Sequence, residues 1–134
     1  MKEDISRLMA RAYDCLEDAR LIYKSGRFTS EPNRSYYAIF DAVNALLRLH
    51  DLYANSHRGA KNRFSELFIK TNLLPREAII WLESCLELRQ SGDYDFDYEV
   101  SEADAAKCIN YASEFILFTD AYLRTQQLKT DDTL

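Results

Sequence analysis

The chain has 134 residues, with 17 Lys and Arg against 22 Asp and Glu, a formal net charge of −5. This acidic balance disfavours a protein that coats duplex DNA or an anionic membrane, while a local basic patch would still permit RNA contacts. Only 3 Gly and 2 Pro accompany 47% hydrophobic residues, which favours long helices and argues against disorder and an all-β fold.

The first predicted helix covers residues 4–25. Its apolar side chains recur at steps of three or one, which is the pattern of a single buried helical face. Gly26 follows directly and is a suitable residue to end a helix.

The second predicted helix covers residues 30–52, with Ser30 as its N-cap and Pro32 in its first turn. Between Tyr36 and Leu49 most residues are apolar, so this helix is apolar on nearly all sides. We therefore expect it to be central, packed on several sides within the chain or on one side by a partner chain.

The remaining chain predicts three more helices. A short one carries Phe64 and Phe68, a fourth runs from Pro75 to a stop at Gly92, and a fifth follows a cap at Ser101. The acid–aromatic segment 93–98 is expected to be an ordered loop. The fold class is thus all-α: an antiparallel up-and-down bundle of four long helices plus one short helix, as one domain over residues 1–126 with a polar tail at 127–134.

Two charged residues interrupt the apolar second helix. Arg34 and Asp41 are seven residues apart, so they share a face, and Tyr37 lies between them. One interpretation is a pair of salt bridges inside the bundle, Arg34 with an acid such as Asp93 and Asp41 with an arginine. The other is a polar cleft or dimer groove in which Arg34 binds a phosphate or nucleotide.

Two loops carry further candidates. His57 and Arg58 stand where a helix begins, either as part of its cap or beside an anion at its N-terminus. Arg89 either tethers Asp93 and Tyr94 of the acidic loop or lies in the same cleft as Arg34.

Other chemistry is sparse. The three glycines cannot form a phosphate-binding loop, and no metal motif or cofactor site appears, so we expect neither metal nor cofactor. Cys15, Cys85 and Cys108 are expected to be core residues in a reducing cytoplasm. No signal peptide or membrane-spanning stretch is seen, so we expect a cytoplasmic protein without membrane contact.

Three short motifs stand at residues 34–40, 56–59 and 89–94. Together they resemble a prokaryotic branch of the HEPN domains. The string Arg34-Ser35-Tyr36-Tyr37-Ala38-Ile39-Phe40 resembles its R-x-YYA-x-F signature. Ser56-His57-Arg58-Gly59 resembles its SHxG element, and Arg89-Gln90-Ser91-Gly92-Asp93-Tyr94 its R-x-x-x-DY element. The likeness covers about residues 5–120 in the right order.

This resemblance implies a helical bundle, a homodimer, here through the second helix, and in many cases a minimal nucleotidyltransferase as partner. In such pairs the HEPN protein is often an RNase toxin and the transferase its antitoxin. Active HEPN RNases pair an Arg with a His a few residues later. Carried over, the Arg is Arg34, but position 41 holds Asp.

We weigh three functions. The first is a dimeric module that binds a nucleotide or a nucleotidyltransferase, with RNase activity doubtful because Asp41 replaces the motif His. The second is a metal-independent endoribonuclease toxin, in which Arg34 holds phosphate and Asp41 or His57 moves protons. The third is a structural helical adaptor.

Overall fold

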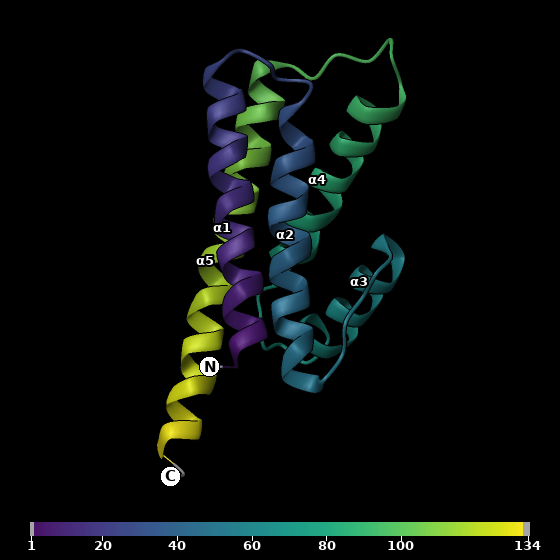
Figure 1. The fold of residues 1–134 in the computed structure, drawn as a ribbon. Coiled ribbons are helices and arrows are strands. Elements are labelled where there is room, and N and C mark those ends of the chain that lie inside the picture. Colours follow the sequence, from purple (N-terminus) through teal and green to yellow (C-terminus); the bar gives the residue numbers. More distant parts are fainter. Residues whose placement is uncertain (1, 133–134) are drawn as a thin grey trace.

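The computed structural model describes residues 2–132, and within that range the chain is an antiparallel helical bundle without strands (Figure 1). The predicted fold class, four long helices plus one short helix, is confirmed. The elements are α1 (Glu3–Lys24), α2 (Glu31–Leu47), the 3-10 turn η1 (Arg48–His50), α3 (His57–Phe64), the π-helical turn η2 (Ser65–Ile69), α4 (Glu77–Tyr94) and α5 (Glu102–Asp132).

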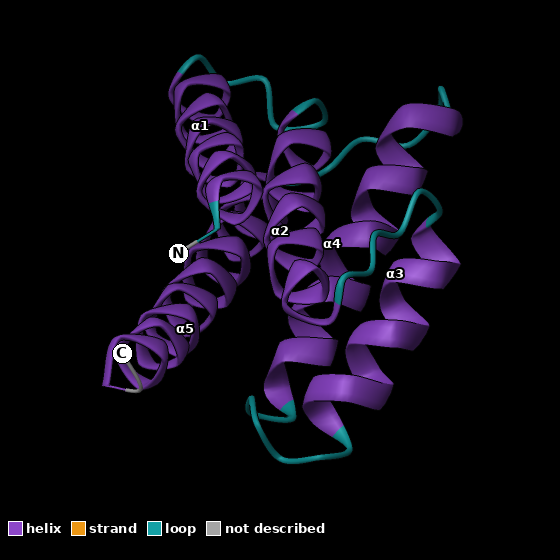
Figure 2. Cartoon of the chain, turned by 60° about the horizontal axis from the view of Figure 1, so that its bottom comes forward, coloured by secondary structure: helices purple, strands orange, loops and turns teal. Residues whose placement is uncertain are grey.

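The central helix is α2, which contacts α1, α3, α4 and α5. Both views place α1 on one side of α2, and α3 and α4 on the other (Figures 1 and 2). Of its 17 residues, 13 are buried, so its apolar sides are covered within the chain itself. The strip that stays partly exposed contains Asn33, Arg34, Tyr37 and Phe40.

The connections around α2 differ from the predicted helix ends. Gly26 ends α1 as predicted and adopts φ +79°. This backbone conformation has a higher free energy for residues that carry a Cβ atom. The second helix ends at Leu47 and not at residue 52, because η1 tightens the chain before the left-handed Asp51. Ser30 occupies the predicted N-cap position, since α2 begins at Glu31, but its backbone is helical and its side chain makes no capping hydrogen bond.

Gly92 does not close the fourth helix, and that prediction is wrong. It lies inside α4, which continues to Tyr94, so the loop begins only at Asp95. A Cβ at position 92 would lie 2.8 Å from the backbone oxygen of Thr29. The glycine therefore allows α4 to pass close to the α1–α2 connection.

The fifth helix begins as predicted. The hydroxyl oxygen of Ser101 accepts a hydrogen bond from the Asp104 amide at 3.0 Å. The helix continues into the predicted polar tail as far as Asp132 and extends past the rest of the bundle (Figure 1), while residues 133 and 134 lie outside the described part.

Candidate functional site

A cleft of about 350 Å³ opens between α1 and α2. The predicted face of α2 is confirmed, because Arg34, Tyr37 and Asp41 all line this cleft. Their spacing of three and four residues places them one above another on a helix. The opposite wall comes from α1 and consists of Arg11, Asp14 and Cys15.

Arg34 has no carboxylate partner within the described residues. Its Nε and Nη2 donate to Asn33 Oδ1 at 3.0 and 2.9 Å, and its Nη1 lies 3.9 Å from Cys15 Sγ. The predicted salt bridge from Arg34 to Asp93 is wrong, because Asp93 is held instead by Asn33 Nδ2 at 2.9 Å and by Arg89 Nε at 3.0 Å. The charge of Arg34 is thus left available at the cleft.

Asp41 lies on the floor of the cleft and is only 4% exposed. The predicted pairing of Asp41 with an arginine is confirmed: Arg11 Nη2 lies 3.6 Å from Oδ1, and the Cys15 thiol lies 4.0 Å from Oδ2. Burial raises the pKa of Asp41, and the nearby charges of Arg11 and Arg34 only partly oppose this shift. A carboxyl of this kind holds a proton at a higher pH than an exposed aspartate does.

A second cluster lies where α3 and α4 meet α2. Arg89 is buried, and its Nη2 donates to the hydroxyls of Tyr37 at 3.2 Å and Tyr94 at 3.3 Å. Its Nε lies 3.0 Å from Asp93 Oδ2. The predicted tether between Arg89 and Asp93–Tyr94 is therefore present.

His57 occupies the first position of α3, where Ser56 Oγ caps the helix by accepting from the Gly59 amide at 3.0 Å. Its imidazole does not reach Arg34. The ring packs among Tyr36, Tyr37 and Phe40, with Nδ1 2.7 Å from the Tyr36 hydroxyl and Nε2 3.2 Å from Arg89 Nη1.

The contact with Arg89 fixes the protonation of His57. A guanidinium only donates, so Nε2 must accept and the proton of the neutral ring sits on Nδ1, facing Tyr36. Burial lowers the pKa of His57, and the positive charge of Arg89 lowers it further.

This arrangement predicts the titration of His57. By NMR, His57 is expected to titrate below the ordinary histidine pKa, because its ring is partly buried and because the charged ring would place a proton against Arg89. Arg89→Met is expected to raise the pKa of His57, because it removes this repulsion. Equal pKa values of His57 in both proteins would contradict this arrangement.

Tyr37 joins the two clusters. The guanidinium carbons of Arg34 and Arg89 lie 5.4 and 5.3 Å from the centroid of its ring, a distance typical of cation–π contact. Arg34 and Arg89 therefore share this ring. The second interpretation, which placed Arg89 in the cleft of Arg34, is wrong, because only Arg34 lines that cleft.

Some candidate residues lie elsewhere, and some residues of the site were not predicted. Arg58 is exposed and does not line the cleft. Arg11 and Asn33 were missed, and Cys15, predicted as a core residue, is only half-buried at the cleft. The one available signal was the i, i+4 spacing of Arg11 and Cys15 on the first helix.

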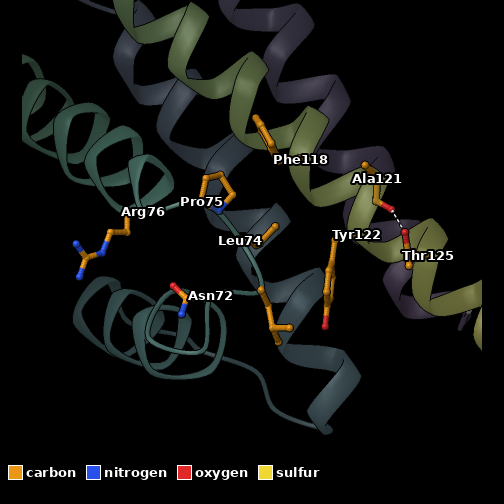
Figure 3. Close-up of a pocket in the computed structure, with 9 residues that line it drawn as sticks. Asn72, Leu74, Pro75, Arg76, Phe118, Ala121, Tyr122 and Thr125 are labelled. Carbon is orange, nitrogen blue, oxygen red and sulfur yellow. Dashed lines mark hydrogen bonds between the residues drawn. The ribbon is translucent and has the colours of Figure 1, made fainter.

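Another pocket, of about 400 Å³, lies between the segment that precedes α4 and the C-terminal half of α5 (Figure 3). Leu74, Pro75, Phe118 and Tyr122 give it largely apolar walls. It shares no residue with the predicted site. Arg76 at its edge and Arg89 are 13 residues apart along α4, or about 20 Å by the rise of a helix.

Residues 2–132 also bear on two other classes of protein, membrane proteins and metalloproteins. No helix in this range has the length and apolarity needed to cross a membrane. No group of three or more His, Cys, Asp or Glu side chains in it is placed to hold a metal ion.

Comparison with known proteins gives consistent matches. A family model described as HEPN domain matches residues 5–122. A UPF0332 protein of Thermotoga maritima is 36% identical over 79% of this chain and 80% of its own length. A Methanocaldococcus jannaschii protein named "Putative toxin MJ0142" is 28% identical over 95% of this chain and 86% of its own. The UPF0332 protein glr0978 of Gloeobacter violaceus is 32% identical over 81% of this chain and 93% of its own.

Proposed function

Since this chain belongs to the HEPN domain family, we propose that it is the phosphate-binding HEPN half of a toxin–antitoxin-like pair. In this proposal the α1–α2 cleft binds the phosphate of a nucleotide or of an RNA strand in the cytoplasm. Binding, and not cleavage by an Arg–His pair, is its main activity. The name of the Methanocaldococcus relative supports a toxin-like system.

The observation that carries the proposal is the state of Arg34. Its guanidinium stands at an open cleft, its hydrogen-bond partners are the neutral Asn33 Oδ1 and Cys15 Sγ, and no carboxylate of the described structure forms an ion pair with it. A guanidinium fork suits the paired oxygens of a phosphate. The charge of Arg11, whose Nη2 lies 3.6 Å from Asp41 Oδ1, offsets part of the repulsion that this carboxylate would exert on such an anion.

The same geometry argues against cleavage by Arg34 with a histidine. The position on α2 that would supply an imidazole holds Asp41, and the lone pair of His57 faces Arg89 and not the cleft. A base of this kind must reach the proton it removes. His57 is not within reach of a phosphate held by Arg34 without moving away from Arg89.

One observation favours a second candidate, a metal-independent endoribonuclease. Arg89 Nη1 and His57 Nε2 lie 3.2 Å apart, so an Arg–His pair exists in space although α3 and α4 supply it separately. Movement of Tyr94, the last residue of α4, and of the acidic loop that follows it would expose this pair to RNA.

Two partners belong to the proposal. A homodimer through α2 would use its partly exposed strip, with Asn33, Arg34, Tyr37 and Phe40, because the apolar sides are already covered. Such a dimer brings two Arg34 side chains to one groove. A minimal nucleotidyltransferase is the proposed second protein, and its nucleotide would be a ligand for this groove.

The test combines binding and cleavage. Purified wild type is expected to bind labelled single-stranded RNA or ATP, and Arg34→Ala to weaken that binding at least about tenfold, as for a lost charged hydrogen bond. The matched control is Arg63→Ala, which removes an exposed arginine of α3. When the wild-type protein is incubated with total RNA in the presence of EDTA, the RNA should remain intact.

The outcomes separate the candidate functions. Cleavage in EDTA that is lost in His57→Ala would replace the binding proposal with the ribonuclease. If the protein shows no binding and no thermal shift with ATP or RNA, the structural adaptor is the favoured function.

A further inference from the structure

A second cleft, of about 380 Å³, continues the groove between α1 and the end of α2. The charged side chains of its lining are three arginines and one aspartate. The residues are Asp4, Arg7, Leu8 and Arg11 from α1, Arg48 from η1, and Tyr53 from the loop that follows. We call Arg7, Arg11, Arg48 and Tyr53 the arginine cleft.

The charges of the arginine cleft are only partly neutralised. Asp4 accepts from Arg48 Nε at 2.6 Å, which satisfies the one acid of the lining. Arg7 makes no ion pair or hydrogen bond within the described residues, and Arg11, 66% exposed, has only the 3.6 Å contact with Asp41. In a chain of net charge −5, this is a local excess of positive charge.

Tyr53 adds a surface of a different kind. It is 54% exposed, and its ring makes no aromatic contact within the described residues. An exposed tyrosine beside guanidinium groups is the combination that binds single-stranded nucleic acid, since the arginines hold phosphates while a base stacks on the ring.

Arg11 links the arginine cleft to the cleft of Arg34, because it lines both. From Asp4 to Cys15 the groove follows α1 for about 16 Å by the rise of a helix. That is room for several nucleotides at the roughly 3.4 Å spacing of a stacked strand. A single phosphate or free nucleotide would fill only part of it.

We propose that the arginine cleft binds a further nucleotide of the single-stranded RNA whose phosphate lies at Arg34. Arg7 and Arg11 hold its phosphate, and Tyr53 stacks on its base. This inference rests on the proposed function and specifies its ligand, because a strand and not a mononucleotide spans both clefts.

The test measures binding of a labelled single-stranded A8 RNA and of AMP by fluorescence anisotropy or competition. Arg7→Gln is expected to weaken A8 binding about tenfold or more and to reduce the slope of log K against log salt by about 0.7. Tyr53→Ala should weaken it between about fivefold and a hundredfold, and Tyr53→Phe should bind as wild type does. Arg63→Gln, an exposed arginine on α3, is the matched charge control.

The outcomes separate this inference from the function on which it rests. If Arg34→Ala weakens A8 binding while Arg7→Gln and Tyr53→Ala behave like Arg63→Gln, the arginine cleft is overturned and the proposed function stands. If wild type binds neither A8 nor AMP, both fail. If Tyr53→Ala weakens the binding of AMP but leaves the binding of A8 unchanged, the proposal of a bound strand is overturned, and the arginine cleft is a pocket for a free nucleotide.

Discussion

Arg89→Ala is expected to lower the free energy of unfolding by about 3 kcal/mol, near the lower end of the range for breaking a buried, charged network. The side chain is buried and joins three elements: it contacts His57 of α3, Tyr37 of α2, and Asp93 near the end of its own helix. Its removal leaves Asp93 without its ion-pair partner and the lone pair of His57 without its donor.

The comparison is with Arg34→Ala, which is expected to change the same free energy by less than about 1 kcal/mol. Arg34 has no carboxylate partner in the described structure, so no buried charge is left behind. Urea unfolding at pH 7.5 measures both. A loss for Arg34→Ala as large as that for Arg89→Ala would show that Arg34 is a structural residue and would remove the main support for the proposed function.

Glu31→Gln is expected to stabilise the protein at pH 8 by up to about 3 kcal/mol. Glu31 is completely buried. Within the described residues its carboxyl group makes one hydrogen bond, with the Ser35 hydroxyl, and its Oε2 has no partner. Burial raises its pKa from 4.5 to about 7. Each unit of difference between the pKa values of the folded and unfolded states corresponds to about 1.4 kcal/mol in the free energy of unfolding.

The sign of this effect follows from proton binding. Between about pH 4.5 and 7 the unfolded chain has lost the Glu31 proton while the folded chain keeps it, so stability falls as pH rises through this window. Below it both states are protonated and the contribution of the neutral carboxyl is fully present. The difference between wild type and Glu31→Gln should therefore grow from pH 4.5 to 7 and then remain constant.

Unfolding midpoints at several pH values test this expectation. The matched control is Glu66→Gln, at an exposed position of η2. A difference between wild type and Glu31→Gln that does not change with pH would show that Glu31 is ionised in the folded protein.

The sequence predicted this helical bundle well because its signals are local. Apolar periodicity identified the helices, and Gly26 identified one end correctly. The errors fall where a distant segment decides the local structure. In the sequence Gly92 resembles a residue that ends a helix, yet it lies inside α4, and its lack of a Cβ atom leaves space for the backbone of Thr29.

For the candidate site, the sequence determined which residues of one helix share a face. Arg34, Tyr37 and Asp41 line one cleft because helical geometry places them together. Their roles in binding stay predictions.

Only the tertiary structure decided which partner each polar group meets. Asp41 meets Arg11 from another helix, Asp93 is held by Arg89 and not by Arg34, and His57 at the start of α3 faces Arg89 of α4. The spacing of residues along a helix determines only which of them lie on the same face of that helix. Contacts between helices depend on the rotation and register that the packed core selects for the whole bundle.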